Sequence, residues 1–188
     1  MKVVSKLLLV FTLLFFTHGI AIAASQQDLN FLYAIRDSDE VRVFEMLSQG
    51  ANPNATSEGG TPALVLALTK GNMNIINKLI DTGAEVNRPQ YPQGVTPLMI
   101  VSSYSSDYEG IFDKMIRAGA YVNQRANGDV TALMQATGKG NYSVVQKLIN
   151  AGAEVNVKND RGYSALYVAR AKGYTDIVKI LRDAGATD

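Results

Sequence analysis

The residue types that carry out most enzyme chemistry are nearly absent from this chain. Its 188 residues contain no Cys, and the single His, His18, lies in the apolar N-terminal segment. Sites that pair a Ser or Cys nucleophile with His need an imidazole, and zinc sites built on His or Cys need those ligands. The composition therefore excludes both kinds of site from the remainder of the chain, and we expect no cofactor and no metal.

Carboxylates are the remaining groups that could act as acid, base or cation ligand. Glycoside hydrolysis by carboxylates alone needs two acids facing each other across a cleft, whereas Asp and Glu fall mainly in predicted turns and loops here. The acidic run 37–40 lacks the Gly and the 12-residue spacing of an EF-hand loop, so a turn before a helix explains it better. Gly59-Gly60 and 138–140 lack phosphate-loop spacing and a preceding strand. We therefore predict that the protein is not an enzyme.

The overall charge argues against nucleic acid as a partner. The chain has 18 basic and 17 acidic residues, a formal net charge of +1. Without Lys2 and Lys6 of the N-terminal segment the balance is 16 − 17 = −1. A surface that binds phosphate backbones normally has a basic excess, so we expect no nucleic-acid binding and no attraction to acidic membranes by charge.

The N-terminal segment 1–24 has the features of a secretory signal peptide. Two lysines precede an apolar run from Leu7 to Phe16, and small residues at Ala21 and Ala23 fit a cleavage site after Ala23 or Ala24. The alternative is an uncleaved anchor, but the run is shorter than the roughly 20 residues that span a bilayer. We predict a signal peptide over 1–24 and an exported chain over 25–188 that is periplasmic or secreted and does not insert into a membrane.

A repeat runs through the rest of the sequence. Gly-Ala followed by two further residues and then Asn occurs four times, and a fifth Gly-Ala lies near the C-terminus; the glycines are Gly50, Gly83, Gly119, Gly152 and Gly185. Their spacing is constant except for the interval from Gly83 to Gly119, which is slightly longer. A second landmark follows each of the first four glycines at a similar distance: Thr61-Pro62, Thr96-Pro97, Thr131-Ala132 and Ser164-Ala165. Two markers in one phase predict a tandem repeat.

Each unit is predicted to form two helices and an exposed loop. Thr or Ser is a favourable N-cap, and Pro is tolerated at the first helical position. A short helix such as 132–138 is followed by a turn at 139–141 and a second helix with apolar pairs at helical spacing. The Gly of the Gly-Ala motif that follows ends the second helix, because Gly adopts the left-handed conformation without strain. A polar loop comes next.

These motifs resemble the ankyrin repeat, and the resemblance covers about residues 26–188. It implies an all-α solenoid of about five helix-turn-helix repeats with protruding loops. The expected repeats are 26–58, 59–93, 94–128, 129–161 and 162–188. The histidine that ties neighbouring loops in the family is replaced in this sequence by Leu64, Met99, Met134 and Tyr167, so we expect apolar packing in its place. The unit 94–128 is the most divergent, since 102–109 replaces its helix–helix turn.

The resemblance implies a protein-binding scaffold, and we expect a monomer whose partner is another protein. Side chains at loop tips are not needed for packing and are available for contact. The candidate contact residues are Ser57, Glu58, Arg88, Gln90, Tyr91, Gln93, Tyr104, Tyr108, Gln124, Arg125, Asn127, Lys158, Asp160 and Arg161. One hypothesis places a binding hot spot on the second loop and the third repeat, where Tyr91, Tyr104, Tyr108 and Tyr121 lie. In the alternative, Tyr104 and Tyr108 only pack a longer turn and Tyr91 is a solvated loop tip.

Several roles fit such a scaffold. The protein could protect or inhibit an enzyme of the cell envelope, or it could be an immunity protein that neutralises a toxin acting in the periplasm. It could also be a secreted effector that binds host proteins, although the cleavable leader weakens that interpretation. Self-assembly through the ends of the solenoid is a further possibility.

Overall fold

The computed structural model describes residues 25–104 and 108–188, so the predicted signal peptide lies outside the described residues. Within them the chain forms five consecutive helix pairs and no multi-residue strand. The first helices of the pairs are α2 (Gln26–Arg36), α4 (Ala63–Lys70), α6 (Pro97–Ser102), α8 (Ala132–Lys139) and α10 (Ala165–Ala171). The second helices are α3 (Glu40–Ser48), α5 (Met73–Asp81), α7 (Glu109–Arg117), α9 (Tyr142–Asn150) and α11 (Thr175–Asp183). Each predicted repeat contains one pair, which confirms the all-α repeat architecture.

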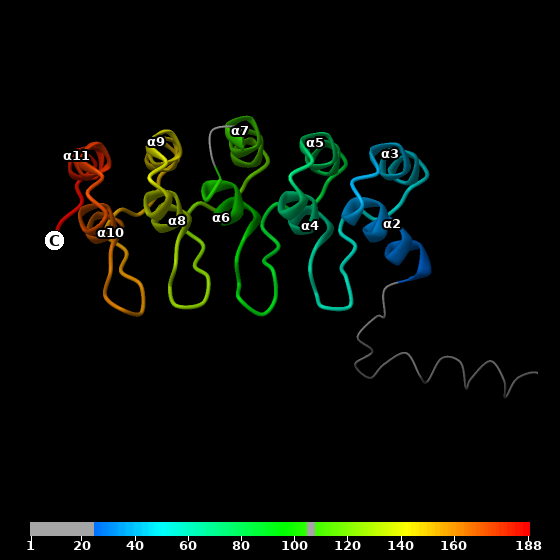
Figure 1. Cartoon of the computed structure of the whole chain (residues 1–188), viewed down its shortest axis with the longest axis horizontal. Helices are drawn as coiled ribbons and strands as arrows, with labels where there is room; N and C mark the ends of the chain where they lie inside the picture. Colours follow the sequence, from blue (N-terminus) through cyan, green and yellow to red (C-terminus); the bar gives the residue numbers. More distant parts are fainter. Residues whose placement is uncertain (1–24, 105–107) are drawn as a thin grey trace, which may run out of the picture.

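The helices stack in two layers (Figure 1). The first helices form one layer, here called the inner layer, and the second helices form the outer layer. Between successive pairs the chain extends as a hairpin on the side of the inner layer away from the outer layer (Figure 1). Each hairpin is closed by one isolated β-bridge: Thr56–Pro62, Gln90–Val95, Ala126–Val130 and Lys158–Ser164.

Local capping fixes where the helices begin and end. Thr96, Thr131 and Ser164 each accept a hydrogen bond from the backbone N–H three residues later, which satisfies a donor that the first turn leaves free. The five landmark glycines have φ between +83° and +91°, a conformation that Gly adopts without strain. These features confirm the predicted caps and the glycine stops.

The second repeat departs from the predicted register by one residue. Helix α4 begins at Ala63, its N-cap is Pro62, and no side chain caps it. Thr61, the cap expected from the sequence, instead lies in the hairpin, where its N–H donates to Ser57 Oγ at 3.1 Å. The distance from the glycine of the preceding landmark to the N-cap residue is the same for Pro62, Thr131 and Ser164. The feature shared by these repeats is therefore the position of the N-cap and not the Thr-Pro pair.

This shift changes which residue replaces the missing histidine. Counting from the helix starts, the equivalent of Met99 and Met134 is Val65 and not Leu64. Val65, Met99 and Met134 are buried, so apolar packing occupies the position in three repeats, as expected. Tyr167 is the exception: it is 50 % exposed and stacks on Tyr163 with ring centroids 4.3 Å apart.

A single apolar core runs between the two layers. It is built from Leu, Ile, Val, Ala, Met and Phe side chains of every helix, and its largest fully buried members include Phe31, Leu68, Ile76 and Phe112. One helix pair could not bury its apolar stripe alone, and stacked neighbours supply the missing contacts. The stacked repeats therefore share one continuous core.

Asparagines connect consecutive repeats through the backbone. Asn87 Nδ2 donates to Gly119 O at 2.9 Å, and Asn87 Oδ1 accepts from Tyr121 N at 2.7 Å. Asn54, Asn123 and Asn156 make the equivalent pair of bonds to the next repeat. The four residues form a ladder along the solenoid, whereas the sequence pattern predicts only turns for them.

The outer layer has its own polar links between repeats. Lys114 Nζ lies 2.8 Å from an Asp81 carboxylate oxygen, and Lys147 Nζ lies 2.7 Å from one of Asp113. Toward the N-terminal end, the Glu40 carboxylate accepts hydrogen bonds from Asn72 and Asn74. These contacts join α3, α5, α7 and α9 in sequence order.

Candidate protein-binding surface

One stripe of every inner helix remains uncovered by the rest of the protein. In α4 the residues that are not buried are Leu66, Thr69 and Lys70, spaced i, i+3, i+4, and this spacing places them on one helix face. The same pattern holds in each repeat, ending at or just after the helix: Tyr33/Arg36/Asp37, Ile100/Ser103/Tyr104, Gln135/Gly138/Lys139 and Val168/Ala171/Lys172. We call these five triplets the inner face.

The inner face is an extended surface rather than a pocket. Its five triplets come from five helices that lie side by side in one layer (Figure 1). Leu66, Ile100 and Val168 are half-buried, so each presents part of an apolar side chain to solvent. A surface of this shape can accommodate an elongated partner.

The hairpins form a second surface beside the inner face. Neighbouring hairpins are hydrogen-bonded to one another: Asn127 N donates to Gln93 O at 2.9 Å, and Asp160 N donates to Gly128 O at 3.0 Å. Asn127 Nδ2 also donates to Pro92 O at 3.0 Å. The second, third and fourth hairpins are therefore held as a connected row.

Several predicted contact residues help to hold these hairpins. Ser57 closes the first hairpin by bonds to Thr61, and Gln90 closes the second by a backbone bond to Val95. Arg88 Nη1 donates to Asn54 O at 3.2 Å and so joins the second hairpin to the first. The expectation that the fold does not need these side chains is therefore wrong for Ser57, Arg88 and Asn127. Gln90 and Asp160 bond through their backbone N–H groups, which leaves the expectation for their side chains untested.

Other predicted residues are more exposed. Glu58, Gln93, Lys158 and Arg161 lie open to solvent, and Tyr91 is 75 % exposed. Arg125 is paired with Asp129 at 3.7 Å. Gln124 is half-buried, and its Oε1 atom is buried without a hydrogen-bond partner among the described residues.

The structure does not bring Tyr91 together with Tyr104 and Tyr108. A Cβ atom at Gly60 of the first hairpin would lie 3.5 Å from Tyr91 Cβ. Tyr104 and Tyr108 instead stack on each other, with centroids 4.5 Å apart, at the connection between α6 and α7. Tyr104 O accepts from Asn141 at the next helix–helix turn. The three tyrosines therefore do not form one cluster, and the stacked pair packs the longer turn as the alternative expects.

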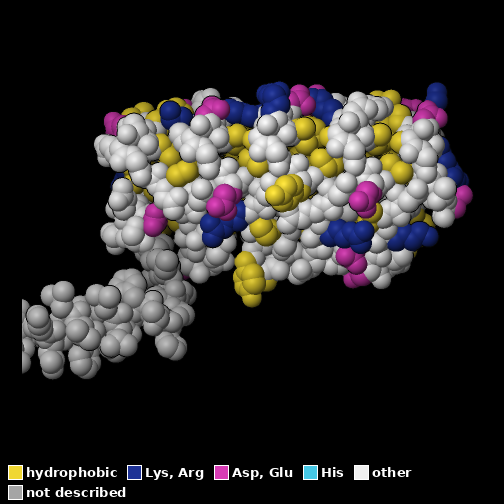
Figure 2. All heavy atoms as spheres, turned by 180° about the vertical axis from the view of Figure 1, so that it is seen from behind, with side chains coloured by type: hydrophobic (Ala, Val, Ile, Leu, Met, Phe, Trp, Pro, Cys, Tyr) yellow, Lys and Arg dark blue, Asp and Glu magenta, His cyan; other side chains and the backbone are white. Residues whose placement is uncertain are grey.

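Some charged side chains of the outer helices form ion pairs, such as Lys114 with Asp81 and Lys147 with Asp113. Figure 2 shows Lys and Arg beside Asp and Glu on the back of the molecule, with hydrophobic side chains exposed between them. Hydrogen bonding to Asp113, together with the nearby charges of Asp113 and Glu109, raises the pKa of Lys147. Near the C-terminus, Arg182 and Arg170 bind the Asp188 carboxylate, and the hydrogen bond from Arg182 lowers its pKa.

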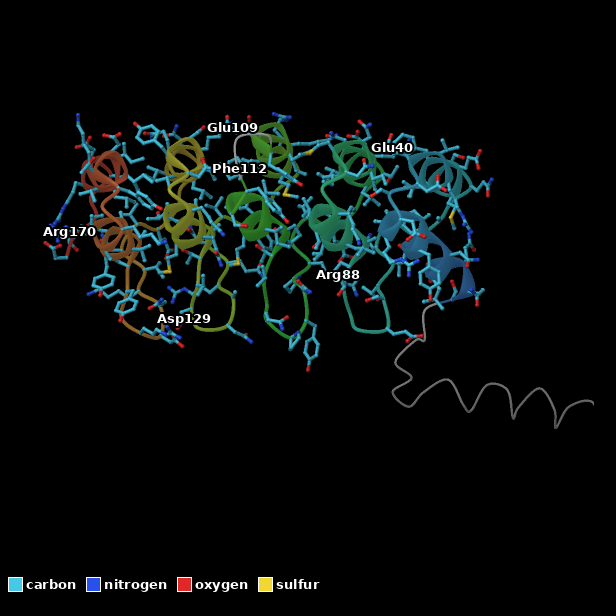
Figure 3. The ribbon with its side chains drawn as sticks, viewed as in Figure 1. Glu40, Arg88, Glu109, Phe112, Asp129 and Arg170 are labelled. Atoms are coloured by element: carbon cyan, nitrogen blue, oxygen red, sulfur yellow. The ribbon has the colours of Figure 1, made fainter. Side chains whose placement is uncertain are left out.

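Figure 3 labels Glu109 in the outer layer, and Arg88 and Asp129 on the hairpin side.

The acidic run 37–40 is used by the local fold. Asp37 pairs with Arg36 at 2.8 Å, which lowers the pKa of this carboxyl group. Asp39 caps α3 by accepting from Arg42 N, and Glu40 binds the asparagines of the next repeat. The turn interpretation is thus confirmed. Over the described ranges, no three His, Cys, Asp or Glu side chains form a group suited to a metal ion.

The sequence reasoning missed most of the inner face. It selected loop tips, whereas Leu66, Ile100, Gln135 and Val168 lie on helices. A usable signal was present, because in each first helix the residues opposite the apolar core recur at i, i+3, i+4. The signal is weak in any single repeat, since these helices are short, from 6 residues in α6 to 11 residues in α2.

The comparisons with known proteins agree with this architecture. None of the helices in the part of the chain that the structure describes is long and apolar enough to cross a membrane. No curated protein is significantly similar to the sequence. The family described as Ankyrin repeats (3 copies) matches residues 31–126 and 101–188. These matches cover the helix pairs, the hairpins and the inner face, and the chain belongs to the ankyrin-repeat family.

Proposed function

We propose that this protein is an exported scaffold that binds another protein through its inner face and the adjoining hairpins, and that it protects or inhibits that partner. The observation that supports binding most directly is the uninterrupted inner face. Five equivalent triplets leave apolar and polar side chains uncovered along the length of the solenoid. The ankyrin-repeat fold fits this proposal, since a solenoid presents an extended surface for a partner.

Export rests on the N-terminal sequence. Two lysines, a short apolar run and small residues at alternate positions form a cleavable leader over 1–24. The partner would accordingly be an envelope or extracellular protein. Expression of the full chain with a C-terminal tag, followed by fractionation and N-terminal sequencing, tests this part separately: cleavage after Ala23 or Ala24 supports export, and an uncleaved chain in the cytoplasm contradicts it.

The binding proposal is tested by capture with matched variants. The tagged protein is used as bait in envelope extract, and captured proteins are quantified by mass spectrometry. Thr69→Arg with Ser103→Arg adds bulk to the inner face, whereas Val41→Arg with Thr175→Arg adds similar bulk to exposed outer positions. A stoichiometric partner lost only with the inner pair supports the proposal. A partner retained by the inner pair and lost with the outer pair would place binding elsewhere.

A protective or inhibitory role is tested next with the captured partner. Its activity is measured with and without the wild-type protein and with the inner pair variant. A change in activity that requires an intact inner face supports the role. An unchanged activity of the partner would contradict the protective or inhibitory role, while the proposal that the protein binds this partner would still stand.

A further inference from the structure

Acidic residues are distributed unequally between the two layers. Helices α4, α6, α8 and α10 contain no Asp or Glu, while Lys70, Lys139 and Arg170 lie in them and Lys172 caps α10. The outer helices α5, α7 and α11 carry both signs. Asp107, in the connection between α6 and α7, lies outside the described residues. From the second repeat onward, the inner helices thus form a basic layer.

Three of the inner cations form no ion pair with another described residue, although Lys70 lies near enough to Asp37 to add to the lowering of its pKa that the hydrogen bond from Arg36 causes. Arg170 binds Asp188, but no ion pair within 4 Å joins Lys70, Lys139 or Lys172 to another described residue. In the outer layer Lys114 and Lys147 are paired, and the outer cations that form no ion pair with a described residue lie on helices that also carry Asp or Glu: Arg42, Lys78, Arg117 and Lys179. The lack of carboxylates on the inner helices therefore distinguishes the inner lysines. The three inner lysines are exposed, and their ammonium groups are available to a partner.

These lysines occupy equivalent positions beside an apolar row. Each is the i+4 member of its inner-face triplet, and the i members Leu66 and Val168, together with Ile100 of the third repeat, are half-buried. A Lys near a helix C-terminus interacts favourably with the helix dipole, which accounts for each lysine taken alone. It does not account for the lack of carboxylates on the four inner helices or for the uncovered apolar side chains next to the lysines.

We infer that the inner face recognises an acidic amphipathic segment of its partner protein. Partner carboxylates would lie against Lys70, Lys139 and Lys172, and partner apolar side chains would pack on Leu66, Ile100 and Val168. Packed helices lie about 8–10 Å apart. Lys139 and Lys172 belong to adjacent repeats and should therefore be about 10 Å apart, whereas Lys70 lies two repeats before Lys139 and should be about 20 Å from it. Acidic groups about two turns of an α-helix apart would meet Lys139 and Lys172, and a further acidic group about four turns away would meet Lys70. This inference rests on the proposed function and specifies the partner's chemistry.

The test is a selection from a library of random peptides displayed on phage, each long enough to form several helical turns, with the whole protein as target at low salt. An inner charge variant, Lys70→Glu with Lys139→Glu and Lys172→Glu, is compared with an outer charge variant, Arg42→Glu with Arg117→Glu and Lys179→Glu. Both variants change the net charge equally, and all six positions are exposed. Circular dichroism of both variants checks that the fold is retained.

The expected outcome is enrichment of acidic peptides that also contain spaced apolar residues. The strongest of them should bind the inner charge variant at least about tenfold more weakly and the outer charge variant with little change, since reversing several charges that face a partner costs more than altering distant ones. Its affinity should also fall markedly as NaCl is raised from low to high concentration, because salt screens exposed charges.

Two other outcomes overturn different statements. Selected peptides that show no acidic bias, or that bind the inner and outer charge variants equally well, would overturn the inferred chemistry of the partner. The proposal that the protein is a protein-binding scaffold would then still stand. A selection that enriches no peptide for the inner face, together with an empty capture in envelope extract, would contradict the proposed function itself.

Discussion

The turn between the two helices of the fourth repeat offers a sharp test of how repeats contact each other. Gly140 has φ of +71°, and a Cβ atom there would lie 2.9 Å from Cζ and 3.2 and 3.3 Å from the two Cε atoms of the Tyr174 ring in the next repeat. Gly173, in the equivalent turn of the fifth repeat, has φ of +74°, and apart from its chain neighbours no described residue has an atom within 4 Å of a Cβ atom placed there. The two glycines therefore share a backbone conformation and differ in the neighbouring ring.

Replacing each glycine by Ala separates the backbone cost from the contact cost. An L side chain in the left-handed region costs about 1–2 kcal/mol, and this is the loss in unfolding free energy that we expect for Gly173→Ala. At Gly140 the methyl group also displaces the Tyr174 ring, and overpacking of this kind costs about 1–3 kcal/mol. Gly140→Ala should therefore lose about 2–5 kcal/mol in total.

The measurement is urea unfolding followed by circular dichroism, comparing midpoints at a common m value. In a Tyr174→Ala background the methyl group at position 140 meets no ring, so the cost of Gly140→Ala should fall to that of Gly173→Ala. Equal costs for the two glycines in the wild-type background would refute the reasoning, as would a Gly140→Ala cost that Tyr174→Ala leaves unchanged.

Three further perturbations follow from the contacts between and within repeats. Asn123→Ala removes two hydrogen bonds to the next repeat and should lower the unfolding free energy by about 1–2 kcal/mol, measured by urea unfolding; a loss near zero would show that water replaces both bonds. Thr137 is fully buried, and its hydroxyl oxygen has no partner among the described residues, so Thr137→Val should be neutral or stabilising by about 1 kcal/mol, and a marked loss of thermal stability would contradict this. The pKa of Lys147 is raised from its ordinary 10.5 by Asp113, so its stabilising contribution is complete below that pH and is lost as the pH rises through the raised pKa. The difference in unfolding free energy between wild type and Lys147→Met should be constant from pH 7 to 9 and shrink above about pH 10.5; a difference that stays constant to pH 12 would argue against the ion pair.

The architecture was readable from the sequence because its signals are local. A left-handed Gly at the end of a helix, a Thr or Ser cap at the start and apolar pairs at helical spacing act within a few residues, and their recurrence establishes the repeat. Even here one local signal misled, because Thr61-Pro62 imitates the landmark Thr96-Pro97 while α4 begins one residue later. The hairpin uses Thr61 for its own closure.

The binding surface was less readable because exposure depends on neighbouring repeats. Arg88 and Asn127 have the composition of free loop residues, yet both bind a neighbouring hairpin. Tyr104 and Tyr108 belong to the longest repeat and have the residue type of a binding anchor, but the helix turn directs them to each other. No local pattern reports such contacts, since they form between groups of different repeats or across a turn.

By itself the sequence determined the repeat period, the helix pairs, the glycine stops and the lack of thiol and imidazole chemistry outside the segment 1–24. The tertiary structure alone decided which polar residues hold the stack and which remain free. Asn87 and Lys114 bond to neighbouring repeats, while Lys70, Lys139 and Lys172 have no ion pair with another described residue. The physical reason is that capping and periodicity act along the chain, whereas burial and pairing depend on which side chains the adjacent repeat places opposite each residue.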